Sequence, residues 1–472
     1  MKKTFAVVLA LVLSMSVLLA GCATSTPAAT TDTAAATTDT AAATTDTAAA
    51  TTDTATTPSG EVVWWGWTPG SPTNEKYIAE FNKLYPDIKV TWKQATVADY
   101  DAALKPALAN GEGVDAFEVS AGSANGGIAI FGGQAVDLTD AVKAALGDDW
   151  QSKLTESSVA TMTVDGQLKA LGVGAVYSGN LWINQDLFDK YNVKVPTNME
   201  EWKTACETFK ANGIIGFVQG AGMGAFNMDT YHAICDNVAP GVFTKACRGE
   251  VAWTDPSLVK GLELWKSLFD EGIMQDGALG LMQYPDANNL FMSQQAAMVM
   301  MGSWYTMNTT PDTMKAAMEA ASSTAEPFTM IPINFPDIAG TGNVGSMFGD
   351  LDYGTAVAAK SKNIDAAIAF AVWLCTSTEG TQVIANSLNV VPSLKSATPD
   401  WNVVKLVNPE KQEAAIKDYL QNATSGGDNP RFADINADLN QAMMDVLAGV
   451  ASGTLTPDAG AAQLQQAYED SM

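Results

Sequence analysis

The sequence predicts an α/β protein with two lobes. Strand and helix patterns alternate along the chain, and this alternation begins twice. The chain has 472 residues, of which 47% are hydrophobic, so it is long and apolar enough to bury more than one core.

The first α/β stretch spans residues 61–119. Strands are predicted at 61–65, 87–92 and 114–119, and helices at 74–85 and 100–109. This order implies a parallel sheet, and ligands of such sheets bind beyond the carboxyl ends of the strands. Those ends lead into residues 67–68, 94–95 and 120–123.

The second stretch repeats the alternation. Strands are predicted at 181–184, 214–219 and 296–301, and helices at 185–191, from Thr197 or Asn198 onward, at 258–271, 366–374 and 434–449. A further buried strand is predicted at 355–358.

Residues 1–21 are typical of a secretory signal. Lys2 and Lys3 precede an apolar run that is short for a membrane-spanning helix. The run ends in Leu19-Ala20-Gly21-Cys22, which resembles the lipobox of bacterial lipoproteins. We therefore expect a lipid on Cys22 that anchors the protein to the extracellular face of the cell membrane. An ordinary signal peptide with a coincidental cysteine is the alternative.

Residues 22–59 predict a flexible tether. The heptapeptide TTDTAAA occurs at 30–36, 37–43 and 44–50, and no large apolar side chain is present to offset the entropy of ordering. The folded part then begins near Glu61.

Charge and composition exclude several classes of protein. A formal charge of −26 argues against binding to nucleic acid, which needs clustered Lys and Arg. The one histidine, His232, excludes multi-histidine metal sites, and no C-x-x-C motif occurs. We expect no metal and no cofactor, and a structural role for His232.

Four cysteines remain after Cys22. They are Cys206, Cys235, Cys247 and Cys375. Export permits disulfides, and the turn at Pro240-Gly241 favours a Cys235–Cys247 pair. Four buried free thiols are the alternative.

An ordered set of landmarks resembles the extracellular solute-binding proteins of ABC importers, in the carbohydrate-binding family that includes maltose-binding protein. The landmarks are VVWWGW at 62–67, FNKLYP at 81–86, IKVT at 88–91, ANGEGVDAF at 109–117, DGQLKAL at 165–171, WINQDLF at 182–188, PTNMEEW at 196–202, AMVMMGSW at 297–304 and SKNIDAAIAFAVWL at 361–374. The resemblance covers about 61–465, with Val114 where proline is usual.

This resemblance implies a periplasmic-binding-protein-like fold, in which two lobes joined by several crossovers close over a ligand cleft. The first lobe would comprise 61–174 and 336–388, and the second 175–335 and 389–472. Such a protein captures a sugar or oligosaccharide and delivers it to a membrane permease, acting as a monomer and not as an enzyme.

A sugar site needs aromatic rings for the C–H faces and polar groups for the hydroxyls. Trp67 and Trp304 are the expected stacking residues, because each follows a predicted strand. Asp350 and Asp352 precede the strand 355–358, and their spacing would point both to one side, where they could grip hydroxyls. The further candidates are Glu118, Ser120, Tyr177, Asn227, Asp229 and Arg431. For each residue, ordinary packing or a solvated surface position is the alternative.

Two other functions stay open at this point. Carboxylates and tryptophans also suit a non-sugar solute such as a polyamine. A surface glycoside hydrolase could nominally use Asp350 and Asp352, but two side chains of one short segment do not easily flank a glycosidic bond.

Overall fold

The computed structural model describes residues 58–96, 99–121, 126–344, 347–425 and 429–472. The expected signal segment 1–21, Cys22 and nearly all of the tether lie outside these residues. The described elements belong to one unit, Thr57–Met472. None of its described helices combines the length and the apolar run that a membrane crossing requires.

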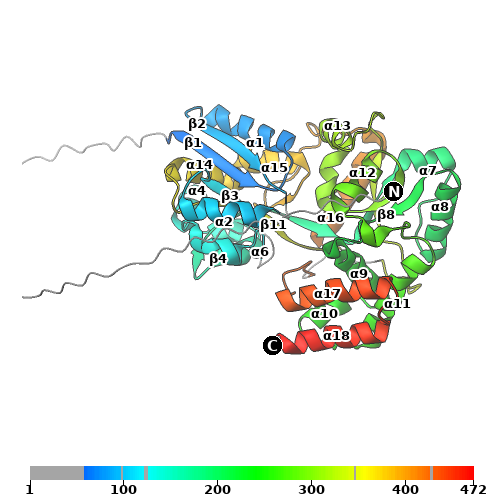
Figure 1. Cartoon of the computed structure of the whole chain (residues 1–472). Helices are drawn as coiled ribbons and strands as arrows, with labels where there is room; N and C mark the ends of the chain where they lie inside the picture. The colour runs from blue at the N-terminus through cyan, green and yellow to red at the C-terminus, as the bar shows by residue number, and fades with distance from the viewer. Residues whose placement is uncertain (1–57, 97–98, 122–125, 345–346, 426–428) are drawn as a thin grey trace, which may run out of the picture. The chain divides into compact units, whose positions relative to one another are not determined.

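The first sheet has six strands in the order β12-β6-β11-β3-β1-β2 (Figure 1). They are β1 (Gly60–Gly66), β2 (Ile88–Gln94), β3 (Ala116–Val119), β6 (Leu171–Ser178), β11 (Phe348–Val357) and β12 (Val391–Pro392). The strands β1, β2 and β3 are parallel, as the sequence predicts, whereas β11 pairs antiparallel with both β3 and β6.

Helices cover this sheet and connect its strands. They are α1 (Ser71–Leu84), α2 (Tyr100–Asn110), α3 (Ile128–Phe131), α4 (Thr139–Leu146), α5 (Trp150–Lys153), α6 (Glu156–Met162), α14 (Ile364–Thr376) and α15 (Thr378–Ser387). A small hairpin, β4 (Thr163–Val164) with β5 (Gln167–Leu168), follows α6.

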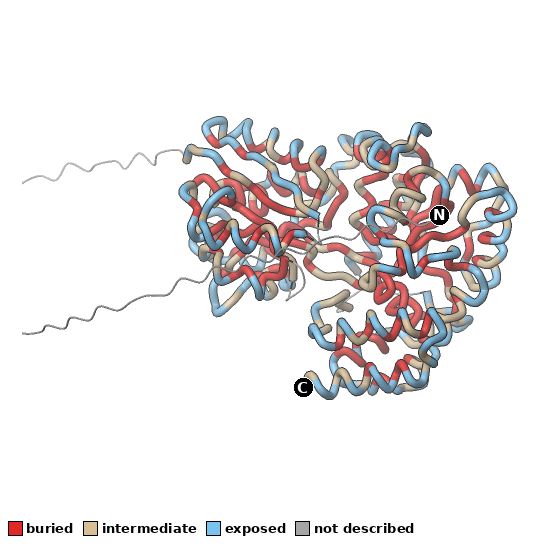
Figure 2. Tube along the Cα trace, viewed as in Figure 1, coloured by how far each residue is buried: buried red, intermediate tan, exposed pale blue. Residues whose placement is uncertain are grey.

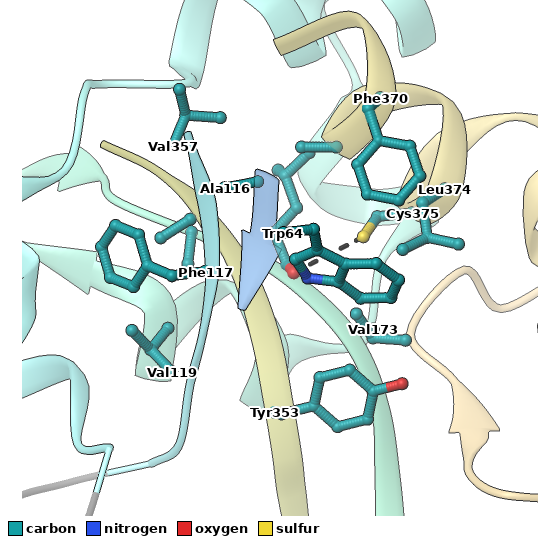
Figure 3. Close-up of a cluster of buried hydrophobic side chains, with 14 of the residues drawn as sticks. Trp64, Ala116, Phe117, Val119, Val173, Tyr353, Val357, Phe370, Leu374 and Cys375 are labelled. Carbon is teal, nitrogen blue, oxygen red and sulfur yellow. Dashed lines mark hydrogen bonds between the residues drawn. The ribbon is translucent and has the colours of Figure 1, made fainter. Parts of the chain in front are cut away.

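The core of this part surrounds Trp64 (Figure 3). Trp64 is fully buried, and its ring packs edge-on against Phe370 of α14. Nearby, the thiol of Cys375 donates to the carbonyl of Leu171. Trp65, the next residue of β1, is buried as well.

The second sheet has four strands in the order β10-β7-β9-β8. They are β7 (Asn180–Asn184), β8 (Ile215–Val218), β9 (Ala296–Met300) and β10 (Met330–Asn334). Figure 2 shows the buried segments concentrated on the strands of both sheets. Two sheets, each with its own core, confirm the predicted fold class.

The helices of the second part are α7 (Gln185–Tyr191), α8 (Met199–Ala211), α9 (Gly224–Val238), α10 (Val242–Cys247), α11 (Pro256–Asp270), α12 (Asn288–Met292), α13 (Pro311–Ala320), α16 (Pro409–Ser425), α17 (Ala437–Ala451) and α18 (Pro457–Asp470). Asn198 caps α8, because its side chain accepts from the backbone N–H of Glu201. Helices α17 and α18 lie side by side and pack on α11 (Figure 1).

The chain passes between the sheets at three places. One residue, Gly179, separates β6 from β7; the others are the return from β10 to β11 and the exit after β12. Gly179 has a φ of 94°, which favours glycine where the chain leaves one sheet for the next. The lobe boundaries at 174/175, 335/336 and 388/389 remain a proposal that rests on the resemblance.

The expected Cys235–Cys247 disulfide is not formed. Both residues are buried free thiols, as are Cys206 and Cys375. Helix α9 continues past Cys235 and directs its sulfur against Gly261 of α11, where an added Cβ would be only 2.8 Å away. Burial raises the pKa of each thiol, so these groups behave as core side chains.

His232 is a core residue, as predicted. It is 1% exposed, and its ring stacks on Phe348 at 3.8 Å and on Phe243 at 4.1 Å between centroids. Burial lowers its pKa, which favours the neutral imidazole.

Candidate ligand-binding site

The carboxyl ends of β1 and β3 place Trp67 beside Glu118. The two strands are parallel neighbours, so their ends lie together. Oε2 of Glu118 accepts from the backbone N–H of Trp67 at 2.8 Å and of Thr68 at 3.3 Å. Glu118 therefore fixes the turn that carries Trp67.

The ring of Trp67 is partly exposed and is held by other rings. It meets Tyr100 edge-on at 5.1 Å and Tyr353 at 6.3 Å between centroids. Gly126 lies against it, and an added Cβ there would be 2.9 Å from the ring. The position leaves part of the indole open to a ligand.

Glu118 is completely buried, and burial raises the pKa of its carboxyl well above the usual range. The two backbone N–H groups work in the opposite direction, and the charge of Asp352 raises the pKa further. Within the described part of the chain, Oε1 of Glu118 has no hydrogen-bond partner. Two residues after Glu118, the backbone N–H of Ser120 donates to the carbonyl of Gly126 at 2.9 Å.

Asp350 and Asp352 lie inside β11, not before a strand as the sequence analysis expected. Leu351 between them is buried in the first core, while both aspartates are partly exposed. The register against β6 shifts between Leu351 and Tyr353, so the same-side arrangement of the two carboxylates stays a prediction. Asp350 accepts from the backbone N–H of Phe432 at 2.5 Å and of Ala433 at 3.0 Å.

Asp352 differs from its neighbour. No described residue donates a hydrogen bond to its carboxylate or forms an ion pair with it. Burial raises its pKa to about 6, and the charge of Arg431 opposes this rise. Its charge also acts on Glu118 and on Arg431, so Asp352 lies near both.

Arg431 forms a buried, two-pronged ion pair with Asp229 of α9. Nε donates to Oδ1 at 2.8 Å and Nη2 to Oδ2 at 2.6 Å. The side chains are 11% and 1% exposed. Two residues that the sequence offered as separate ligand contacts therefore contact each other.

Trp304 follows β9 and is the second partly exposed tryptophan of the site. Its Nε1 donates to the hydroxyl of Tyr284 at 3.0 Å, and Cζ of Arg431 lies 4.7 Å from the ring centroid. Phe226 meets the ring edge-on at 6.0 Å. The ring is thus oriented by a hydrogen bond, a cation and a second ring before any ligand arrives.

Tyr177 lies where β6 approaches the second sheet. Its backbone N–H donates to Oγ of Ser303, next to Trp304, and its ring lies against Gly349. Burial and the charge of Asp350 raise the pKa of its hydroxyl. The structure therefore brings Tyr177 to the same place as Trp304 and Asp350.

Asn227 is buried and internally bonded. It donates to the carbonyl of Ala221 and accepts from Gln219, so it supports the glycine-rich segment 219–224. Next to it, a groove of about 580 Å³ is lined by residues that include Gly222, Leu279 and Met444. Ala221 bridges to Met282, two residues before Tyr284, so the groove adjoins the surroundings of Trp304.

Tyr284 and Phe226 also contact Trp304, although the sequence does not predict either of them as a site residue. Tyr284 is 43% exposed on an irregular segment, where no strand or helix pattern marks a site. Phe226 lies in the first turn of α9, and its only signal is that it follows the glycine-rich segment.

Taken together, the described residues build a binding surface of rings and carboxylates. Hydrogen bonds, ring contacts or electrostatic interactions link Trp67, Glu118, Tyr177, Asp229, Trp304, Asp350, Asp352 and Arg431. Ser120 and Asn227 stay at its margins. Among the described residues, no cluster of His, Cys, Asp and Glu could hold a metal ion.

Comparison with known proteins gives a family match. The family model described as bacterial extracellular solute-binding protein matches residues 64–381. No protein with a curated description matches the sequence.

Solved structures share the fold at low sequence identity. A protein of Caldanaerobius polysaccharolyticus studied for xylan utilization is 23% identical, with a TM-score of 0.67 over 86% of this chain and 99% of its own. The GacH receptor of Streptomyces glaucescens, solved unliganded and with acarbose, is 22% identical, with a TM-score of 0.63 over 87% and 98%. The maltose/maltodextrin-binding domain of Bdellovibrio bacteriovorus, bound to maltotriose, is 17% identical, with a TM-score of 0.60 over 87% and 99%.

Proposed function

Because the chain belongs to the bacterial extracellular solute-binding protein family, we propose that it captures an oligosaccharide and delivers it to the permease of an ABC importer. Members of this family bind solutes and are not enzymes, which excludes the alternative that the protein is a glycoside hydrolase. The observation that carries the proposal is the pair of partly exposed, oriented tryptophans. Trp67 contacts Tyr353, the neighbour of Asp352, and Trp304 contacts Arg431, whose charge acts on Asp352.

The geometry suits a saccharide in two ways. The rings of Trp67 and Trp304 offer faces for the apolar C–H surfaces of sugar units. The partly exposed carboxylate of Asp352 offers acceptors for ring hydroxyls, and leaving it without donors when a ligand displaces its water costs free energy. One structural neighbour comes from a study of xylan utilization, and two others were solved with acarbose and with maltotriose, which supports a saccharide as the solute class.

Ligand capture would be coupled to closure. Asp352 lies on β11 of the first sheet, whereas Trp304 follows β9 of the second. A ligand that contacts both binds the closed arrangement better than the open one, and that difference in affinity shifts the population. The permease would then recognise the closed state.

We infer in addition that the mature protein is anchored through a lipid on Cys22, because a basic start, an apolar run and a lipobox-like ending stand in order. Mass spectrometry of the N-terminal peptide from membranes of the native host tests this. An unmodified Cys22, or cleavage at another position, would contradict it.

The function is tested by ligand screening of the mature chain. Xylo-, malto- and chito-oligosaccharides of two to six units are added in a thermal-shift assay, and hits are titrated by calorimetry. A ligand at about 100 times its Kd stabilises the native state by about 2.7 kcal/mol. Spermidine serves as the non-sugar solute. A shift with spermidine and with none of the saccharides would overturn the proposal.

A further inference from the structure

The charges of the site do not balance. Among the described residues that define it, the carboxylates are Glu118, Asp229, Asp350 and Asp352, and the cation is Arg431. Burial favours the protonated form of Glu118, but three aspartates still lie around one guanidinium.

Three of these carboxylates have partners within the protein. Asp229 receives both prongs of Arg431, Asp350 receives two backbone N–H groups, and Oε2 of Glu118 receives two more. Arg431 donates to Asp229 through Nε and Nη2, and it forms no ion pair with Asp352 among the described residues. Its charge acts on Asp352 from a distance, but it donates no hydrogen bond to that carboxylate.

Asp352 has no such partner in the part of the chain that the structure describes. Close to it, the fully buried Glu118 also has one oxygen, Oε1, without a hydrogen bond. Removing water from a carboxylate on ligand binding costs free energy, unless an opposite charge or strong hydrogen-bond donors replace that water. Neutral hydroxyls supply donors only, whereas an ammonium group supplies three donors and the missing charge.

The surroundings of Asp352 suit a cation in two further respects. The partly exposed ring of Trp67, which contacts Tyr353 next to Asp352, attracts ammonium groups through its quadrupole. The chain as a whole carries a formal charge of −26, a field that attracts cationic ligands and repels anionic ones.

We propose that the captured oligosaccharide carries a protonated amino group and that Asp352 is the residue that receives it. This inference rests on the proposed function and narrows its ligand to saccharides with a free amine. Trp67 and Trp304 contact the sugar rings, while Asp352 pairs with the ammonium group and makes the site prefer it over the same sugar with a neutral substituent.

The experiment compares matched saccharides on the parent and on Asp352→Asn. Chito-oligosaccharides with free amines are titrated by calorimetry beside their fully N-acetylated counterparts of equal length, with xylo- and malto-oligosaccharides as neutral references. The exposed surface variant Asp87→Asn is the matched control. Melting curves of all three proteins verify that they are folded.

The proposal expects the free amine to bind the parent about tenfold or more tightly than the N-acetylated form, a difference of about 1.4 kcal/mol, because a hydrogen bond to a charged group is stronger than one to a neutral group. Asp352→Asn should remove that preference, and Asp87→Asn should retain it. Equal or tighter binding of the neutral sugars by the parent, or an unchanged amine preference in Asp352→Asn, would overturn the inference while leaving the sugar-binding function standing. If no saccharide binds, the proposed function itself fails.

Discussion

The guanidinium of Arg431 lies over the ring of Trp304, with Cζ 4.7 Å from the ring centroid. The same guanidinium holds the buried carboxylate of Asp229 with two hydrogen bonds. Arg431 thus links helix α9, which carries Asp229, to the ring of Trp304. Its role is therefore to support Trp304 more than to contact the ligand.

Arg431→Met should destabilise the protein strongly. It leaves Asp229, 1% exposed, without its countercharge, and breaking a buried pair in this way costs about 3–5 kcal/mol. Arg248, the other arginine, pairs with Asp434 at side-chain exposures of 33% and 29%, so Arg248→Met should cost only about 0–1 kcal/mol. Urea unfolding measures both, and equal losses would contradict the assigned role of Arg431.

Trp304→Ala should weaken ligand binding by about 2 kcal/mol or more, as truncation of a central aromatic residue does. The matched variant is Trp373→Ala in α14, 3% exposed and remote from the candidate residues, which should cost about 3–5 kcal/mol of unfolding free energy and leave affinity near that of the parent. Calorimetry and melting curves separate the two effects. If Trp304→Ala binds the native sugar as tightly as the parent, the assigned site is wrong.

Two substitutions of Glu118 distinguish positioning from direct contact. Glu118→Gln keeps an oxygen that can accept from Trp67 and Thr68, so affinity should stay near the parental value. Glu118→Ala leaves those N–H groups without their acceptor and should cost about 1–3 kcal/mol in the free energy of unfolding, with weaker binding because Trp67 is released. An equal loss of affinity in Gln and Ala, with the Gln variant stable, would show that the carboxylate itself contacts the ligand.

Asp350→Asn tests the contact between β11 and residues 432–433. The amide retains one acceptor oxygen but brings an NH₂ group toward two backbone N–H donors, so binding should weaken by about 1–3 kcal/mol. Because Arg431 directly precedes these donors, the orientation of Trp304 should suffer too. Unchanged affinity in calorimetry would separate Asp350 from the site.

Asp352 should make the ligand-free protein less stable as the pH rises. Its native pKa is about 6 against an ordinary value of 3.8, so between about pH 4 and pH 6 the native state binds more protons than the unfolded state. The free energy of unfolding then falls through this window, by roughly 3 kcal/mol in total. Asp352→Asn should therefore be more stable than the parent above pH 6 and equal to it below pH 4.

Urea unfolding at several pH values, with Asp87→Asn as the baseline, measures this difference. A gap between Asp352→Asn and the parent that does not change with pH would contradict the native pKa of Asp352.

The elements that the sequence predicts well are those with local signals. The strand predicted at 61–65 is β1, Gly60–Gly66, and the helix predicted at 185–191 is α7, Gln185–Tyr191. Strand alternation, helical spacing and helix caps each involve only a few neighbouring residues, so they can be recognised from the sequence alone. The sequence marks Trp67 and Trp304 as candidate stacking residues for the same reason, because each follows a well-marked strand.

The rest of the site depends on contacts between distant residues. Asp229 and Arg431 are 202 positions apart in the sequence, and no local pattern predicts that they form an ion pair. The segment with Asp350 and Asp352 contains residue types with low strand propensity, such as Gly and Asp, so its sequence suggests a turn. Pairing with the distant strand β6 makes it a strand. The Cys235–Cys247 pairing was wrong because α9 runs through Cys235 into the core.

The stacking of His232 between Phe243 and Phe348 gives the molecule a spectroscopic handle. Since the chain contains one histidine, isotope labelling of that residue type yields a single imidazole spin system. Its signals should be displaced by the ring currents of both phenylalanines, and Phe348 opens the same strand that carries Asp350 and Asp352. A rearrangement of β11 on saccharide binding would thus register as a chemical-shift change of one resolved resonance, without any engineered probe.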